Sequence, residues 1–441
     1  MEVKTFKGGA HIPHHKSYTE DKPITRLSAP KEVIIPLLQC MGAPCEPLVK
    51  VGDKVEIGQK IGDSEEFFSA PVHASVTGTV TAIEKRTVPT GDQDDCIVIE
   101  ADEGPQEFEM KEVRDPDTVT VEEYRECVRE GGLVGMGGAA LPTHIQTSPR
   151  QPVDTLLLNG AECEPFLTCD HRLMVEKAEQ LIKGAEMMMK SIGASRTLIG
   201  IEVNKPDAIE AINKITEGRD DIEVVPLAVK YPQGFKSHMI KAATGRDVPR
   251  GARSAELGCI VRNVGTTVAS YEATVYTKPL IERIVTVSGP KVPNPGNYVI
   301  KIGTPIAHVL KECGVEDIEE LEGHKVVNGG PMTGLAQLDL NAPVVKNTTG
   351  VLVLPPEMIA EEGYTDCVRC GKCVEMCPIY LYPSKISTFA EAELLDEAEA
   401  WDIMDCIECG ICAYTCVANR PMVQLIRRAK QKIQKKQRAE K

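Results

Sequence analysis

The sequence predicts a multidomain chain that joins all-β and α/β units. Its 441 residues are about three times the length of a typical domain, so two to four domains are expected. Short strands with Gly and Asp turns occupy residues 33–84, and strands alternate with helices from about 117 to 275. Eight of the 16 cysteines lie between 367 and 416, which marks a separate C-terminal unit.

Composition and charge exclude several classes of protein. The net charge of −15 excludes a general nucleic-acid binder, because phosphate contacts need clustered Lys and Arg. The first ten residues lack the apolar region of a signal peptide, and no apolar run reaches the roughly 18–20 residues that span a bilayer. We therefore expect a cytoplasmic protein, or one peripheral on the cytoplasmic face of the membrane. Metal ligation explains the many cysteines better than a disulfide framework does.

Residues 1–30 show little periodicity and predict an extended N-terminal arm. His11, His14 and His15 lie within five residues, a density that can indicate a metal site. Histidines on such arms usually bind nothing, and we expect no metal here.

Residues 31–105 are predicted to form a small β domain. Short strands at 51–55 and 57–62 are separated by Gly and Asp turns, and a second half at 69–72 and 78–80 repeats this pattern. The unit resembles the barrel-sandwich hybrid of biotinyl and lipoyl domains. Those carriers place a modifiable lysine at a tip that here is Glu-Glu-Phe-Phe at 65–68, so we expect a structural module.

Residues 115–275 are predicted to form an α/β domain. Predicted strands lie at 155–158, 197–203 and 222–227, and predicted helices lie at 121–130, 174–192 and 207–215. This alternation favours a largely parallel sheet with right-handed crossovers. A shorter α/β segment follows at 280–352, and Pro355-Pro356 then indicates a linker.

The strongest motif of the sequence lies at 357–420. Four cysteines follow the spacing Cys-x2-Cys-x2-Cys-x3-Cys-Pro, and four more repeat it with Val417 in place of proline. A loop with a cysteine at every third position can place three thiolates around one cubane cluster, while the fourth cysteine binds the other cluster. Zinc sites use pairs of ligands rather than two matched quartets. We therefore predict two [4Fe–4S] clusters and an electron-transfer protein.

This crossed arrangement assigns the eight ligands to two sets. One cluster takes Cys367, Cys370, Cys373 and Cys416, and the other takes Cys406, Cys409, Cys412 and Cys377. Gly371 and Gly410 let the backbone pass close to the sulfides. A predicted helical insert at 386–404 separates the two quartets.

A glycine-rich loop at 131–143 follows the first predicted helix. Backbone amides without side chains can approach a phosphate or an isoalloxazine closely. Alone, such a loop is weak support for a nucleotide or flavin, and a tight turn in a packed α/β unit is the alternative.

The wider pattern resembles a known family. The glycine-rich loop, the segment Leu-Asn-Gly-Ala-Glu-Cys-Glu-Pro at 158–165 and Arg-Asn-Val-Gly-Thr-Thr at 262–267 are similar to the FMN-binding flavoprotein subunit of respiratory complex I. With the arm, the barrel-sandwich and the ferredoxin-type unit, nearly the whole chain resembles the RnfC family, the C subunits of the Rnf complex. Gly-Gly-Pro-Met-Thr-Gly at 329–334 is specific to that family.

The resemblance implies cofactors and residue roles. Such proteins exchange hydride between NADH and FMN and pass electrons through their clusters to membrane partners. Residues expected at the FMN are Gly135, Gly137 and Gly138 in the loop, Asn159 and Glu162 at the ring or ribityl chain, and Asn263 and Thr266 at the phosphate end. No side chain is nominated as catalytic. The resemblance also implies a ubiquitin-like SLBB fold at 280–352.

Three departures from the family pattern leave alternatives open. Phe235-Lys236-Ser237 replaces a small residue followed by Glu-Lys, and Gln146 replaces a frequent lysine beside the flavin phosphate. Cys40 and Cys45 stand where the family has His and a small residue; they are either a redox-active pair or two ordinary thiols. The main interpretation is an NADH-linked oxidoreductase subunit with Rnf membrane subunits as partners. Its rivals are a soluble RnfC-like carrier that feeds a reductase such as proline reductase, and clusters that only brace the fold.

Residues 421–441 are predicted to form a basic helical tail. The segment carries eight Lys or Arg and one Glu, a net charge of +7. Such a helix can dock on a partner or on an anionic membrane surface. A solvated helix end is the alternative.

Overall fold

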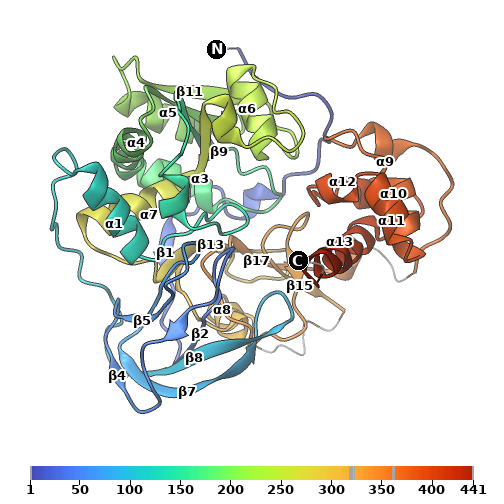
Figure 1. Ribbon diagram of the computed structural model, residues 1–441. Coiled ribbons are helices and arrows are strands. Elements are labelled where there is room, and N and C mark those ends of the chain that lie inside the picture. The colour runs from blue at the N-terminus through green and yellow to red at the C-terminus, as the bar shows by residue number, and fades with distance from the viewer. Residues whose placement is uncertain (1, 317–320, 322, 360–362, 440–441) are drawn as a thin grey trace.

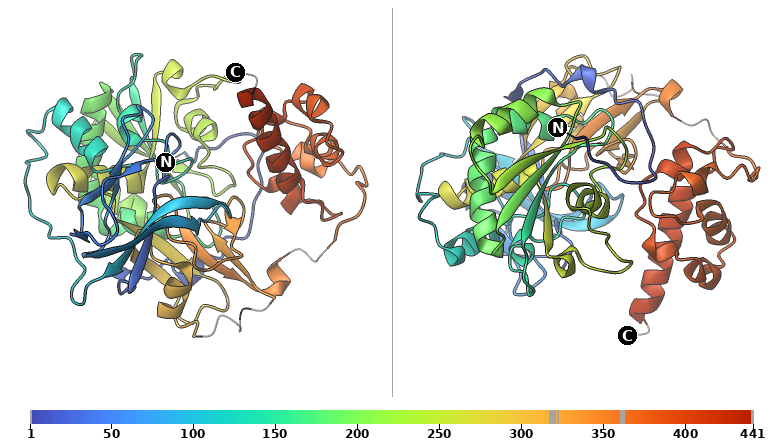
Figure 2. Two further views of the ribbon diagram at one scale, coloured as in Figure 1. Left: turned by 60° about the horizontal axis from the view of Figure 1, so that its bottom comes forward. Right: turned by 90° about the horizontal axis from the view of Figure 1, so that it is seen from above.

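The computed structural model describes residues 2–316, 321, 323–359 and 363–439 (Figure 1). Their strands form four sheets, of six, four, four and three strands. The sheets belong to three units packed together, and the cysteine-rich helices form a fourth unit on one flank, as Figure 2 also shows. Within the described part of the chain, no helix combines the length and apolar character needed to cross a membrane.

Two small antiparallel sheets form the barrel-sandwich. One has the order β2-β8-β7-β4 and the other β3-β5-β6. Their strands are β2 (Glu32–Pro36), β3 (Glu46–Pro47), β4 (Lys54–Val55), β5 (Lys60–Asp63), β6 (Val72–His73), β7 (Gly78–Thr87) and β8 (Gln93–Ala101). Alternating apolar side chains such as Val33 and Ile35 on β2, and Ile97 and Ile99 on β8, fill the space between the sheets.

A parallel sheet forms the centre of the α/β unit. Its order is β11-β10-β9-β12, with β9 (Thr155–Gly160), β10 (Arg196–Glu202), β11 (Ile222–Leu227) and β12 (Cys259–Asn263). The helices are α1 (Val121–Glu130), α2 (Thr143–Gln146), α3 (Cys169–Glu176), α4 (Ala178–Ile192), α5 (Pro206–Ile215), α6 (Lys236–Thr244) and α7 (Val264–Val275), with a short 3-10 turn at Ser254–Leu257. Apolar residues of α1, α4, α5 and α7 share one core, and those of α6 pack on the opposite face.

One predicted helix differs from the observed structure. The sequence predicts a single helix over 174–192, but α3 ends and α4 begins around Lys177, whose φ of −125° and ψ of 31° are not helical. The Lys177 ammonium pairs with the Glu272 carboxylate of α7 at 2.6 Å. The apolar periodicity continues through this break, which is why the sequence pattern does not reveal it.

A mixed six-stranded sheet follows, with the order β1-β14-β13-β17-β15-β16. Its strands are β13 (Glu282–Ser288), β14 (Gly296–Lys301), β15 (Lys325–Asn328), β16 (Leu335–Ala336) and β17 (Gly350–Leu354), and α8 (Ile306–Glu312) packs against them. The outermost strand, β1 (Ile24–Arg26), comes from the N-terminal arm and pairs in parallel with β14.

The arm also contacts the other units. Lys4 and Ala10 form bridges with Leu227 and Tyr231, and a 3-10 turn covers Lys16–Tyr18. Gly8 lies against Pro378, because a Cβ at this glycine would lie 3.3 Å from the Pro378 Cα. The described part of the arm is therefore largely extended and contacts three other parts of the molecule.

The cysteine-rich unit is helical. It contains α9 (Lys372–Glu375), α10 (Pro383–Glu391), α11 (Leu395–Ala400), α12 (Ile411–Tyr414) and α13 (Met422–Ala439), with 3-10 turns at Pro356–Met358 and Ile403–Asp405. Helix α13 places Met422, Ile426 and Ile433 in the core of this unit. Its basic side chains pair with acids of the insert, for example Lys432 with Glu393. The predicted basic tail is thus a packed helix of the cluster unit.

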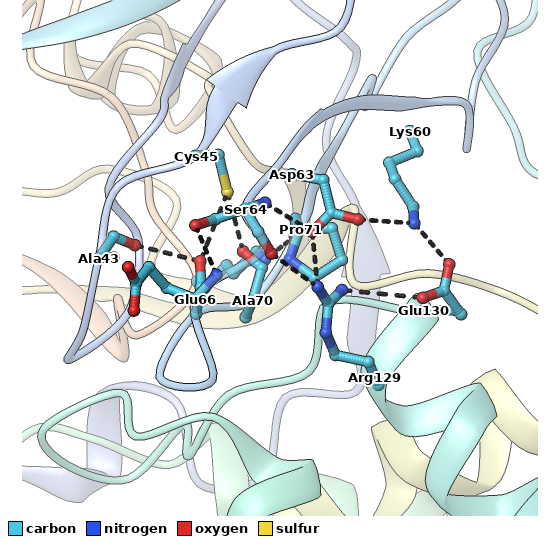
Figure 3. Close-up of polar contacts among 12 residues, drawn as sticks. Ala43, Cys45, Lys60, Asp63, Ser64, Glu66, Ala70, Pro71, Arg129 and Glu130 are labelled. Carbon is cyan, nitrogen blue, oxygen red and sulfur yellow. Dashed lines mark hydrogen bonds and ion pairs between the residues drawn. The ribbon is translucent and has the colours of Figure 1, made fainter.

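Ion pairs join the barrel-sandwich to the α/β unit (Figure 3). Asp63 accepts from the Arg129 guanidinium at 2.7 Å, and Lys60 bridges Asp63 and Glu130 at 2.8 and 2.5 Å. These pairs lower the pKa of Asp63 to about 2, against the opposing effect of burial. The buried Lys346 ammonium donates to the carbonyl oxygens of Pro71 and Gly132 at 2.7 Å each, so three units meet at this side chain.

Candidate functional site

The parallel sheet contains a topological switch point between β9 and β12. The chain proceeds from β9 to β10 and β11 on one side, and β12 then adds on the other side of β9. In open parallel sheets, ligands bind in the crevice outside the carboxyl ends of the strands at such a point. Asn159 on β9 and Asn263 on β12 are direct partners in the register at this end. Two of the predicted cofactor residues therefore meet at the crevice.

The glycine-rich loop lies over the same crevice. A Cβ at Gly137 would lie 2.9 Å from the Asn263 Cβ, so only glycine lets the loop approach this closely. A Cβ at Gly138 would meet nothing within 4 Å, and Gly135 lies near Gln146. The Met136 amide donates to the Thr266 hydroxyl at 2.9 Å. The structure thus brings the loop glycines together with Asn263 and Thr266.

Asn159 connects the crevice to the segment that precedes α6. Its side-chain amide donates to the Gly234 carbonyl at 2.7 Å, and its amide oxygen accepts from the Ala161 backbone at 3.2 Å. Lys236 lies at the start of α6. Burial and the nearby Arg262 lower the pKa of Lys236.

The Glu162 carboxylate is bound at the start of α3. It accepts from the backbone amides of Asp170 at 2.7 Å and His171 at 3.1 Å. The Glu162 backbone has a φ of 46°, which is unusual for a residue with a Cβ. Burial and the Glu162 charge raise the pKa of Asp170 to about 7. The Glu162 carboxylate therefore has helix-capping partners in this structure.

Several buried polar atoms near the loop lack hydrogen-bond partners among the described residues. Three of them belong to α2, which follows the loop directly: Thr143 Oγ1, His144 Nδ1 and Gln146 Oε1. Gln233 Nε2, next to Gly234, is a fourth. Buried polar groups without partners are rare and often mark a ligand site. FMN has a polar ring edge, a hydroxylated chain and a phosphate, and these groups fit such surroundings. The sequence analysis did not name Thr143, His144 or Gln233 as candidate cofactor residues.

One cysteine quartet lines a cavity. Cys377, Cys406, Cys409 and Cys412 all face it, together with apolar residues such as Ile386 and Ile426. Burial and the neighbouring thiols raise the pKa of Cys409 to about 12, so thiolates here need a cationic ligand. This cysteine set is the one that crossed ligation predicts, and the chemistry of the donors fits a [4Fe–4S] cluster.

The other quartet lies in a more open segment. Cys370 is exposed, Cys367 and Cys416 are partly buried, and Cys373 is buried. The backbone repeats that of the first quartet: Arg369 and Glu408, each two residues after the first cysteine, have φ values of 56° and 53°. Gly371 and Gly410 have φ values of 80° and 84°. The two motifs thus adopt one conformation in two environments.

The cavity quartet lies directly beside the α/β unit. The Tyr231 hydroxyl donates to the Cys409 carbonyl at 2.7 Å, and His238 Nε2 lies 3.1 Å from the Pro378 carbonyl. Tyr231 stands three residues before Gly234, the hydrogen-bond partner of Asn159. A single short segment therefore contacts both the crevice and the cysteine loop.

Cys40 and Cys45 lie in the barrel-sandwich as free thiols. The Cys45 thiol is 3.3 Å from the Ala70 carbonyl (Figure 3), and burial raises the pKa of both cysteines. Raised pKa values reduce the thiolate fraction on which reactivity depends.

Four family models match the chain. They are the RnfC barrel sandwich hybrid domain at 4–104, the Nuo51 FMN-binding domain at 128–272, the SLBB domain at 284–336 and the 4Fe-4S dicluster domain at 359–417. These matches confirm the predicted fold class. Together with the crevice and the two quartets, they define an electron-transfer flavo-iron–sulfur protein whose cofactors are FMN and [4Fe–4S] clusters.

Two relatives are similar over almost their whole length. The C subunit of the Na(+)-translocating ferredoxin:NAD(+) oxidoreductase complex of Acetobacterium woodii is 42% identical over 439 residues, which cover 98% of each chain. The C subunit of the proton-translocating ferredoxin:NAD(+) oxidoreductase complex of Clostridium ljungdahlii is 40% identical over 96% of this chain and 93% of that protein. The chain belongs to the RnfC family, the C subunits of ion-translocating oxidoreductase complexes.

A solved structure shares the fold. The crystal structure of an NAD+-reducing [NiFe]-hydrogenase in the air-oxidized state superposes with a TM-score of 0.51 at 19% identity. The match covers 74% of this chain and 68% of that chain. At this identity the likeness concerns the fold alone.

Proposed function

We propose that this chain carries electrons between NADH and the other subunits of an ion-translocating complex. The observation that supports this most is the 231–234 segment, which hydrogen-bonds to Asn159 at the crevice and to Cys409 in the cavity quartet. An electron leaving the crevice therefore meets the Cys406 quartet before the Cys367 quartet. The relatives are subunits of ferredoxin:NAD(+) oxidoreductase complexes, which supports NADH as the reductant or product at the crevice.

The residues of the crevice are proposed to hold FMN as follows. The amides of Gly135, Gly137 and Gly138 would approach the flavin, and Asn159 would contact its ring through the side chain that now bonds Gly234. Asn263 and Thr266 would lie at its phosphate end, at the start of α7, where the helix dipole favours an anion. Glu162 would contribute indirectly: its carboxylate accepts hydrogen bonds from the first amides of α3 and so fixes the position of that helix. When bound, FMN supplies the conversion between a two-electron hydride and single electrons.

The cysteines are proposed to bind two clusters in the crossed pattern. The cavity set of Cys377, Cys406, Cys409 and Cys412 would form the inner cluster, and Cys367, Cys370, Cys373 and Cys416 the outer one. The exposed Cys370 places the outer cluster next to the surface, where electrons can pass to a neighbouring member of the complex. Contact with the other subunits would hold the protein at the cytoplasmic face of the membrane.

Two alternatives that the sequence leaves open have less support. A soluble carrier that feeds a reductase is not favoured, because the similarity to the C subunits of such complexes extends over nearly the whole chain. Direct docking of the basic tail on anionic lipid requires free cations, but Arg427, Lys430 and Lys432 of α13 are all paired with acids of the same unit.

An anaerobic titration tests the proposal. The full-length protein is purified without oxygen, its flavin and iron contents are measured, and NADH is added while the absorbance is recorded. Bleaching of flavin and cluster bands by NADH is the expected result. Clusters that respond to dithionite but not to NADH, in a protein that contains FMN, would contradict the NADH assignment.

A further inference from the structure

Arg262 is a buried cation without an acidic partner. It lies on β12 directly before Asn263 and is only 7% exposed. Its Nη1 donates to the Val261 carbonyl at 2.5 Å, and its Nε has no hydrogen-bond partner among the described residues. Within the described part of the chain it also forms no ion pair. A buried guanidinium usually has a carboxylate or phosphate partner, because leaving the charge unpaired is costly.

The Arg262 side chain lies on the same face of the sheet as the glycine-rich loop. Successive strand residues alternate between faces, so Arg262 shares its face with Ile260. Ile260 packs in one core with Leu133 and Val134 of the loop, whereas Val261 packs with the α6 residues on the other face. Arg262 is therefore enclosed beneath the loop and α1.

Within residues 2–316, 321, 323–359 and 363–439, no carboxylate neutralises this position. The ionisable groups that interact with Arg262 are Tyr124 on α1 and Lys236 on α6. Burial raises the pKa of Tyr124 to about 12, so its hydroxyl is neutral at pH 7, and Lys236 adds a second cation. The described ionisable groups around Arg262 are therefore neutral or positively charged.

Gln146 of α2 also has a buried side-chain oxygen, Oε1, without a hydrogen-bond partner among the described residues. Gln146 lies near Gly135 of the loop, on the same side of the sheet as Arg262. We propose that Arg262 binds the phosphate group of FMN, which would supply the missing anionic partner of its guanidinium. This inference rests on the proposed flavin site.

The chemistry of a guanidinium suits this role. Its planar donors can bind two phosphate oxygens at once, and such charge-assisted bonds are about twice as strong as neutral ones. The phosphate would satisfy Nε and the remaining donors of Arg262 together. Riboflavin has the same ring and ribityl chain but no phosphate, so it provides a ligand that lacks only this interaction.

The test compares FMN with riboflavin. The full-length, cluster-loaded protein is freed of flavin, and the dissociation constants of both flavins are measured by quenching of their fluorescence. In the native sequence FMN is expected to bind at least about tenfold more tightly than riboflavin, because one charged hydrogen bond has that effect. Arg262→Gln is expected to weaken FMN about 10- to 100-fold and to leave riboflavin unchanged. Equal affinity of the native protein for both flavins would overturn the proposal without any variant.

Two further variants refine the test. Arg262→Lys retains a positive charge and serves as the test if Arg262→Gln does not fold. It should weaken the binding of FMN less than Arg262→Gln does and leave the binding of riboflavin unchanged. As a matched control, Arg246→Gln removes a guanidinium that already pairs with Asp154 and should change neither constant.

The possible failures are distinguishable. If the native protein binds neither flavin, the flavin site itself is wrong. If both flavins bind but Arg262→Gln weakens them equally or not at all, the flavin site stands and the role of Arg262 is refuted.

Discussion

The two cysteine quartets share one motif but occupy different surroundings. The loop at 406–412 is enclosed between the α/β unit and α13, with Tyr231 on the Cys409 carbonyl and Lys430 on the Cys406 carbonyl. The loop at 367–373 has an exposed cysteine and an exposed Val368. Their matching backbone angles show that the motif determines the local conformation. The rest of the fold gives the two loops different surroundings, and the proposed order of electron transfer rests on this difference.

The strongest test of this difference removes one ligand from each loop. Cys409→Ala should lower the iron content by about one cluster and stop reduction of the remaining cluster by NADH, because the inner step is lost. Cys370→Ala, the same position in the outer motif, should lose as much iron but leave a cluster that NADH still reduces. Iron analysis with rapid-mixing absorbance or EPR distinguishes the two. If NADH reduces the remaining cluster equally well in both variants, the proposed order is wrong.

A second pair of variants tests how tightly each loop is packed. Gly371→Ala and Gly410→Ala both place a Cβ at a positive φ, which costs about 1–2 kcal/mol. Only the Cβ at Gly410 would clash, at 2.7 Å from the Met332 carbonyl of the neighbouring unit, which adds about 1–3 kcal/mol. The thermal midpoint of the cluster-loaded protein should therefore fall further for Gly410→Ala. Equal decreases of the thermal midpoint in the two variants would mean that the close packing of Gly410 against Met332 does not affect stability.

A smaller effect is expected from the Tyr231 hydroxyl. Tyr231→Phe removes its hydrogen bond to the Cys409 carbonyl, which is worth about 0.5–1.5 kcal/mol. Reduction of the inner cluster after NADH mixing should slow up to about tenfold, while flavin reduction keeps its rate. Tyr414→Phe, at an exposed tyrosine of the cysteine-rich unit, is the control. An unchanged rate in Tyr231→Phe would show that this contact does not position the loop for electron transfer.

The smallest predicted effect concerns the reduction potential. Lys430 donates to the Cys406 carbonyl at 2.8 Å, which places its charge beside the inner quartet. A nearby cation stabilises the reduced, more negative cluster, so Lys430→Gln should lower one midpoint by roughly 40 mV, or about 1 kcal/mol. Lys432→Gln, which removes a more exposed pair with Glu393, should shift neither midpoint. A redox titration monitored by EPR measures the midpoint potentials of both clusters. Equal shifts in the two variants would contradict a specific effect of the Lys430 charge on the inner cluster.

The sequence predicted some parts of the molecule better than others. The cysteines of each motif lie close together in the sequence at a fixed spacing. The cluster unit could therefore be recognised without knowledge of its packing. Strands with continuous apolar runs, such as β9 and β11, also matched their predicted ranges closely. Helix α7 was missed, because most of its residues are buried and it shows no amphipathic stripe.

The candidate cofactor site could be recognised as a site only from the tertiary structure. The glycine-rich loop, Asn159 and Asn263 could be named from motifs, but their meeting follows from strand order, which no local pattern encodes. Arg262 stands out in the sequence only as part of a motif. Its significance depends on the lack of a nearby carboxylate among the described residues, which is a property of the packed interior.

The N-terminal arm has a consequence for the order of assembly. Gly8 lies against Pro378, and the Tyr380 hydroxyl is 3.4 Å from the Lys7 carbonyl, so the arm contacts a unit that lies much later in the chain. Domains generally fold from the N-terminus during synthesis, but this contact cannot form until the cysteine-rich unit emerges. Because metal binding and folding are coupled, iron supply would then govern when the arm closes. A cell short of iron would accumulate chains in which the segment around Lys7 and Gly8 is more accessible to proteases than in the cluster-loaded protein.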